Sequence, residues 1–120
     1  MPDPKRKKRI EESIRRELGR LLLSYPRQPL FNKIMITDVD VAPDLSVAKV
    51  FFSTFAEVDV AEAKNQLEQE MKFLRMSLAR NLNLRLTPRL NFVHDVSIQK
   101  ARQISLLIDQ AIASDESHHN

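Results

Sequence analysis

Apolar residues recur at intervals of three and four along much of this chain, which is the spacing of one face of a helix. Three stripes of this kind are present: Ile10, Ile14, Leu18, Leu21 and Leu22; Ala63, Leu67, Met71, Leu74, Leu78 and Leu82; and Ala101, Ile104 and Ile108 with Ala111 or Ile112. They predict an N-terminal helix, a central helical segment and a last helix. Neither Gly nor Pro interrupts residues 60–86, so the central segment is either one long helix or two in sequence.

Residues with capping chemistry stand where these helices are expected to begin. Asp3 and Pro4 suit the N-cap and the first position of the N-terminal helix. Asp59 and Glu62 have the spacing of a capping box ahead of the central segment. Ser97 is the expected cap of the last helix.

Strand-forming residues dominate three other segments, residues 33–41, 46–55 and 89–95. Pro43 and Asp44 supply a turn between the first two, because proline presets φ and an Asp side chain can bond the backbone just after it. The first two strands are therefore expected to form a hairpin.

The first strand is expected to be irregular at two places. Ile34 and Ile36 are out of phase with Val39 and Val41, which predicts a bulge near Thr37-Asp38. Asn32 precedes the strand, and Asn is a residue that tolerates the left-handed conformation a sharp entry would need.

The predicted order is helix, strand, strand, helix in one or two pieces, strand and helix. A hairpin followed by a crossover helix into another strand gives an α+β fold with a three-stranded mixed sheet and the helices on one face. The length suits one domain, expected over residues 1–113, followed by a polar tail over residues 114–120.

Composition excludes several kinds of chemistry. The chain has no Cys, so disulfides, thiolate metal sites and Cys nucleophiles are excluded. Its one glycine, Gly19, lies inside a predicted helix, so no glycine-rich phosphate loop is present. The aspartates near the first turn lack the glycine and the distal Glu of a calcium-binding loop, which argues against a metal site there. His94 and Asp95 are neighbours on a strand and point to opposite faces, which argues against a catalytic His–Asp pair. We therefore expect no enzyme activity, no cofactor and no metal.

Charge is unevenly distributed, although the net charge is only +3. Residues 71–94 carry five basic groups and no acid, whereas residues 37–70 carry eight acids. Residues 5–9 are all basic and open a helix, where the macrodipole disfavours cations, so we expect them to face an external anion. Two basic segments favour a polyanion such as RNA. The predicted RNA contacts are Lys5, Arg6, Lys7, Lys8, Arg9, Lys72, Arg75, Arg80, Arg85 and Arg89.

Several blocks of residues, in order along the chain, resemble ribosome-binding factor A. They are Arg15-Arg16-Glu17-Leu18, Thr37-Asp38-Val39, Pro43-Asp44-Leu45-Ser46, Ala48-Lys49-Val50, Phe73-Leu74-Arg75, Leu84-Arg85-Leu86 with Pro88, and Phe92 through Asp95. The resemblance implies a type II KH-like fold in which a kinked helix replaces the helix–Gly-loop–helix. In the family, Ala and Gly usually mark the kink, where this chain has Glu70 and Lys72.

The resemblance also implies a function and partners. The expected protein is a cytoplasmic, non-catalytic, monomeric RNA-binding factor of ribosome biogenesis. It would bind 16S rRNA and the free immature 30S subunit, support late 30S maturation and rRNA 5′-end processing, and leave with the help of an assembly GTPase. In this family, growth in the cold commonly depends on the factor. The alternative is a KH-like protein–protein adaptor whose basic faces serve only solubility; no membrane partner is expected, because the chain has no apolar run of spanning length.

Overall fold

A computed structural model describes residues 4–96 of the chain. Along this part the elements are α1 (Pro4–Ser24), η1 (Phe31–Lys33, a 3-10 helix), β1 (Ile34–Val41), β2 (Val47–Thr54), α2 (Val60–Gln69), α3 (Met71–Leu82) and β3 (Arg89–His94). The three predicted strands are confirmed, and the central helical segment is two helices. The predicted last helix, with its Ser97 cap, lies outside the described residues.

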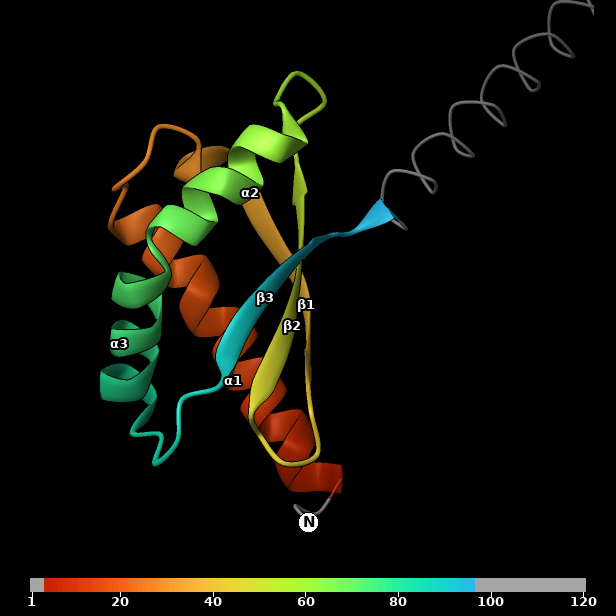
Figure 1. Cartoon of the computed structure of the whole chain (residues 1–120), viewed down its shortest axis with the longest axis vertical. Coiled ribbons are helices and arrows are strands. Elements are labelled where there is room, and N and C mark those ends of the chain that lie inside the picture. Colours follow the sequence, from red (N-terminus) through yellow and green to blue (C-terminus); the bar gives the residue numbers. More distant parts are fainter. Residues whose placement is uncertain (1–3, 97–120) are drawn as a thin grey trace, which may run out of the picture.

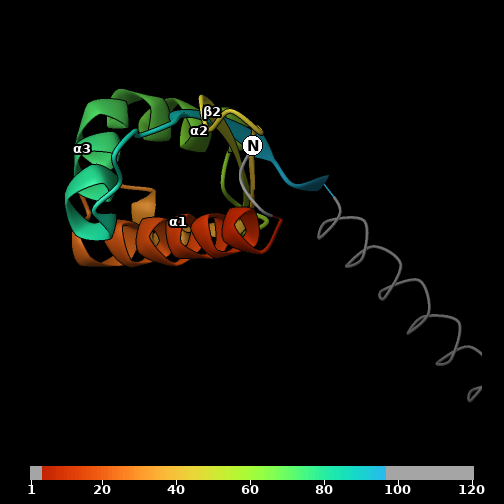
Figure 2. The ribbon, with the colours of Figure 1, turned by 90° about the horizontal axis from the view of Figure 1, so that it is seen from below.

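The strands form one mixed sheet in the order β1-β2-β3. β1 and β2 are antiparallel, as a hairpin requires, and β3 returns parallel to β2 after the crossover through α2 and α3. Figures 1 and 2 show that the three helices all lie on one side of this sheet. The predicted α+β architecture, a type II KH-like arrangement, is confirmed.

The core lies between that face of the sheet and the apolar stripes of the helices. Alternate residues of each strand point inward and are at most 7% exposed: Ile34, Ile36, Val39, Val41, Ala48, Val50, Phe52, Leu90 and Phe92. The helices contribute Ile14, Leu18, Leu21, Leu22, Ala63, Leu67, Leu74 and Leu78, all at most 1% exposed. Burying each Leu or Phe side chain contributes about 1.5–3 kcal/mol, so the predicted stripes supply most of what holds the fold together.

The bulge and the hairpin turn are confirmed at the predicted residues. Ile36 pairs with Phe52 and Asp38 with Phe51, so Thr37 is the extra residue that brings both halves of β1 into phase with the core. In the turn, Asp44 Oδ1 accepts hydrogen bonds from the backbone N–H of Ser46 at 3.1 Å and from its hydroxyl at 2.6 Å.

The expectation of a left-handed backbone conformation at Asn32, before β1, is wrong. Asn32 lies in η1, where the backbone keeps helical φ, and among the described residues positive φ occurs at Leu45 (62°) and Asn83 (52°). Leu45 closes the hairpin turn, and Asn83 ends α3 in the αL conformation that commonly terminates helices.

Side-chain hydrogen bonds fix the helices at their ends and to one another. Asp59 caps α2 by accepting from the N–H groups of Ala61 at 2.9 Å and Glu62 at 3.3 Å, as the capping spacing predicts. Glu17 of α1 accepts from Asn81 Nδ2 of α3 at 2.8 Å. None of the helices within residues 4–96 is long and apolar enough to cross a membrane.

Candidate nucleic-acid interface

A groove runs between α3 and the start of β3, and basic side chains line it. One hollow of about 430 Å³ is bounded by Met71, Lys72, Arg75, Met76, Ala79 and Thr87. A second, of about 350 Å³, is bounded by Val47, Met71, Arg75, Arg89, Leu90 and Asn91. Both share Met71 and Arg75, so the two hollows adjoin, and three of the predicted RNA contacts, Lys72, Arg75 and Arg89, meet there.

Arg75 stands at the junction and is held in place by the backbone. Its Nε donates to the carbonyl oxygen of Pro88 at 3.2 Å, and its Nη2 donates to that of Thr87 at 3.0 Å. These bonds attach α3 to the segment that leads into β3. A further bond, from the N–H of Arg89 to Ser46 O at 2.9 Å, ties the start of β3 to the hairpin. Arg75 therefore positions this segment, a role that its charge alone did not predict.

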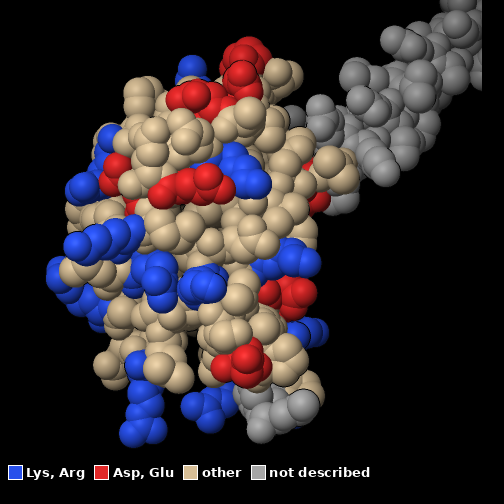
Figure 3. Space-filling model, in the orientation of Figure 1, with Lys and Arg blue, Asp and Glu red and all other residues tan. Residues whose placement is uncertain are grey.

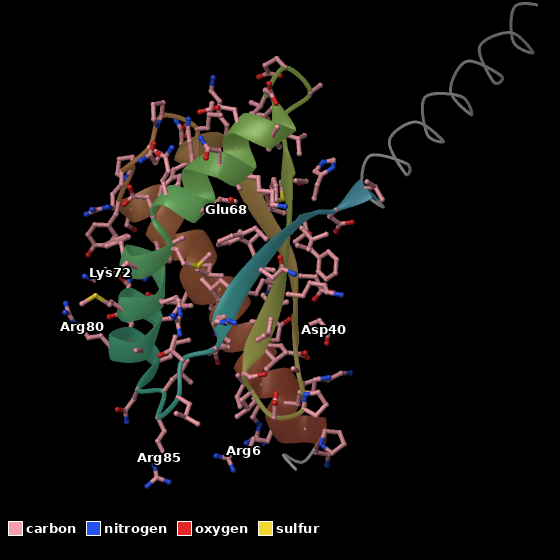
Figure 4. The ribbon with its side chains drawn as sticks, viewed as in Figure 1. Arg6, Asp40, Glu68, Lys72, Arg80 and Arg85 are labelled. Carbon is pink, nitrogen blue, oxygen red and sulfur yellow. The ribbon has the colours of Figure 1, made fainter. Side chains whose placement is uncertain are left out.

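The other predicted cations of this region are exposed. Figure 4 shows Lys72 and Arg80 on the outer side of α3 and Arg85 at the lower end of the molecule. In Figure 3, Lys and Arg gather over α3 and the start of β3, whereas Asp and Glu gather over α2 and above it. Within residues 4–96, none of Lys72, Arg80, Arg85 and Arg89 has an acidic partner within salt-bridge distance. Their charge is thus available to an external anion.

The kink between α2 and α3 falls at Glu70, whose φ and ψ are −102° and 19°. Its carboxylate accepts hydrogen bonds from Arg27 Nε and, at 2.9 Å, from Gln28 Nε2. The bond from Arg27 and then that from Gln28 hold the pKa of Glu70 below its ordinary value of 4.5. The negative charge that Glu70 brings to this corner is therefore neutralised inside the molecule.

Aromatic contacts also lie beside the kink between α2 and α3. The Arg27 guanidinium lies over the ring of Phe73 at 4.4 Å, and Tyr25 meets Phe73 edge to face at 5.8 Å between centroids. Together with Glu70, these residues attach the segment after α1 to the kink. The sequence singled out Glu70 and Phe73 but not their contacts with Arg27, because Arg27 and Glu70 are 43 positions apart.

The N-terminal basic segment lies at the same end of the molecule as Arg85. Figure 4 shows Arg6 and Arg85 both projecting from this lower end. Lys7 lies 3.5 Å from Asp40 and 3.9 Å from Glu11, an internal pairing that the sequence did not predict. For Arg6, Lys8 and Arg9, no acidic group of the described residues lies within salt-bridge distance.

His94 and Asp95, which were considered for catalysis, make contacts within the fold. His94 packs against Phe52 with 5.8 Å between ring centroids, and Asp95 accepts a hydrogen bond from the Thr37 hydroxyl at 2.7 Å. Nowhere in residues 4–96 do three or more His, Asp or Glu side chains cluster as metal ligands would.

Comparison with known proteins identifies the family. The family model of ribosome-binding factor A matches residues 6–108. The chain belongs to the ribosome-binding factor A family. The Nitrosospira multiformis ribosome-binding factor A is 40% identical over 116 residues, which cover 96% of this chain and 92% of that protein. The Azoarcus sp. (strain BH72) factor is 38% identical over 115 residues, covering 95% of this chain and 91% of its own length.

Solved structures of the family have the same fold. The crystal structure of ribosome-binding factor A from Thermus thermophilus aligns with a TM-score of 0.67 at 25% identity, over 73% of this chain and 94% of that one. A homology model of the Thermus thermophilus factor has also been fitted into the cryo-electron-microscopy map of a complex of the 30S subunit with ribosome-binding factor A. Those coordinates align with a TM-score of 0.55 at 24% identity, over 76% of this chain and 92% of that one. The kink of the ribosome-binding factor A fold is present here although Glu70 and Lys72 occupy its usual Ala and Gly positions.

Proposed function

We propose that this protein binds the free immature 30S subunit through its 16S rRNA and supports late 30S maturation and rRNA 5′-end processing without catalysis. The observation that carries the proposal is the basic groove between α3 and β3, in a chain that belongs to the ribosome-binding factor A family. Arg side chains suit phosphate because the planar guanidinium can donate two parallel hydrogen bonds to it.

The groove favours recognition of RNA by shape and phosphate over readout of base sequence. The described residues of its walls include Met71, Met76 and Leu90 but no aromatic ring on which a base could stack. Stacking platforms are the usual means of reading single-stranded bases. A rigid groove with cations along it instead follows a sugar–phosphate backbone, which suits structured rRNA.

The proposed contacts are the cations of both basic segments. In the groove region they are Lys72, Arg80, Arg85 and Arg89. Arg75 contributes those guanidinium N–H groups that do not bond to the carbonyl oxygens of Thr87 and Pro88. At the N-terminus they are Lys5, Arg6, Lys7, Lys8 and Arg9, which open α1 at the end of the molecule where Arg85 projects. One rRNA surface that follows this end could meet both segments.

The remaining steps of the proposal follow the family. The protein acts in the cytoplasm as a monomer, occupies its site while the subunit matures, and leaves before translation with the help of an assembly GTPase. Growth in the cold is expected to depend on it. A protein–protein adaptor is the competing possibility, in which the basic groove has no part in binding.

The experiment compares two triple variants with the same change in net charge. One reverses exposed cations in and around the basic groove (Arg80→Glu, Arg85→Glu, Arg89→Glu), and the other reverses exposed cations elsewhere (Lys33→Glu, Lys49→Glu, Lys64→Glu). Binding of each purified protein to immature 30S subunits is measured by co-pelleting, with thermal unfolding as the folding control. We expect the groove variant alone to lose binding while both keep their Tm. Equal binding by the two variants would favour the adaptor.

A further inference from the structure

An apolar groove lies on the other side of the molecule from the basic one, where α1 faces the edge strand β1. It has a volume of about 390 Å³ and reaches from Gly19 and Leu23 of α1 across Met35 to Phe55. The side chains of Leu23, Met35 and Phe55 are 71%, 51% and 50% exposed. Gly19 widens the groove, since a Cβ there would meet nothing within 4 Å. Apolar surface gathered in this way usually marks a contact with another segment or molecule.

A buried hydroxyl in the groove wall also lacks a partner. Ser53 lines the groove at the end of β2 and is only 4% exposed. Its Oγ has no hydrogen-bond partner among the described residues. Buried polar groups are nearly always hydrogen-bonded, so this hydroxyl is an unusual polar feature of the groove wall.

The chain itself leads to this groove as it leaves β3. The N–H of Asp95 donates to Phe52 O at 2.7 Å, and the Asp95 carboxylate accepts from the hydroxyl of Thr37, the bulged residue of β1, at 2.7 Å. Residue 95 therefore lies over β2 and β1, near Met35 and Ser53 in the adjoining part of both strands. Figure 1 shows the chain leaving the sheet beyond the end of β3. Twenty-four residues, 97–120, follow from that point.

The sequence of that segment complements the groove. Ala101, Ile104, Ile108 and Ile112 recur at helical spacing without an interrupting Gly or Pro. Such a stripe needs an apolar surface to cover it, and one is present beside the point where the segment begins.

We propose that the apolar stripe of residues 97–113 docks into the groove between α1 and β1 of the same molecule. Ten residues of helix span about 15 Å, so a segment of this length is ample for a groove that starts beside its first residue. The docking covers Leu23, Met35 and Phe55 and leaves the basic groove between α3 and β3 open. The inference is independent of the proposed function, because it concerns a different face of the molecule.

Paramagnetic broadening in NMR spectra of the full chain tests the proposal. The chain has no Cys, so Lys33→Cys at the rim of the groove gives a single attachment site for a nitroxide spin label. We expect loss of the amide signals of residues 101–112 in this labelled protein. A label at Arg80→Cys, on the outer side of α3, is the matched control and should leave those signals intact. Adding Met35→Glu to the Lys33→Cys protein should restore them.

The outcomes separate the possible occupants of the groove. Unbroadened signals in the Lys33→Cys protein, or broadening that survives Met35→Glu, would overturn the proposal. Broadening that appears only between labelled and isotope-enriched molecules mixed together would assign the groove to a second copy, and would overturn it too. Since Met35 is half-exposed, Met35→Glu should not unfold the domain, and thermal unfolding verifies this.

Discussion

Replacing Arg75 tests whether this residue holds the groove in place or only supplies positive charge. Its guanidinium donates to Pro88 O at 3.2 Å and to Thr87 O at 3.0 Å, and both acceptors lie in the segment that leads into β3. Arg75→Ala removes both bonds. Hydrogen bonds from a charged donor contribute about 1.5–3 kcal/mol when buried, and less where water can replace the partner. Since this side chain is half-buried, we expect a loss of about 1–3 kcal/mol in the free energy of unfolding.

Thermal and urea unfolding of matched variants measure this loss. For a domain of this size, about 1–3 kcal/mol corresponds to a Tm lower by about 4–12 °C. Arg75→Lys should recover little of it, because an ammonium cannot reproduce the two-pronged donation of the guanidinium. Arg80→Ala is the control on the same helix. Its side chain is exposed, so its unfolding free energy should change by no more than about 0.5 kcal/mol.

Binding to immature 30S subunits completes the test. If Arg75 holds the segment before β3 in place, Arg75→Lys weakens binding although the net charge is unchanged. If Arg75 only attracts phosphate, Arg75→Lys binds nearly as well as the wild type. An Arg75→Ala protein that unfolds at the wild-type urea concentration would refute the assignment of these hydrogen bonds.

Three further outcomes are expected. Arg85→Ala and Arg89→Ala should each lower the slope of log binding constant against log salt concentration by about 0.7–0.9, measured by salt titration of subunit binding; unchanged slopes would exclude phosphate contacts there. Deleting residues 1–9 should weaken subunit binding most at low salt and barely change the Tm, because the loss of Lys7 and its exposed pair with Asp40 costs little; normal binding with a large Tm loss would make the segment structural. Glu70→Gln should flatten the dependence of stability on pH at acid pH. The pKa of Glu70 is lowered in the folded protein, so its contribution is full above the ordinary value of 4.5 and is lost as pH falls through the lowered one. Acid unfolding curves that coincide for variant and wild type would contradict this.

The elements that the sequence predicted are those set by local pattern. Alternation placed the inward residues of each strand, and the phase change in β1 located the bulge at Thr37, because a one-residue shift exposes a whole strand face. The Asp59 cap and the Asp44 turn were also predicted, since each bonds backbone groups only two or three positions away. Local chemistry and core burial agree at these positions.

Contacts between distant segments could not be predicted in the same way. The side chain of Glu70, at the kink, bonds to Arg27 and Gln28, which lie more than 40 positions earlier, and the role of Arg75 depends on carbonyl groups that any residue possesses. The pattern of apolar residues runs through the kink without a break, so it left one helix or two open. Charge segregation correctly placed a basic surface on α3 and β3, but it did not separate Arg75, which is bonded internally, from the exposed Arg80 and Arg85.

Sedimentation of a cell lysate through a sucrose gradient tests the central claim most directly. The protein is detected by immunoblotting in each fraction, at low salt so that phosphate contacts survive. We predict that it migrates with free small subunits and is scarce on translating ribosomes, and that the Arg80→Glu, Arg85→Glu, Arg89→Glu variant stays at the top of the gradient. Migration of the wild type with soluble proteins alone would contradict the account and favour an adaptor.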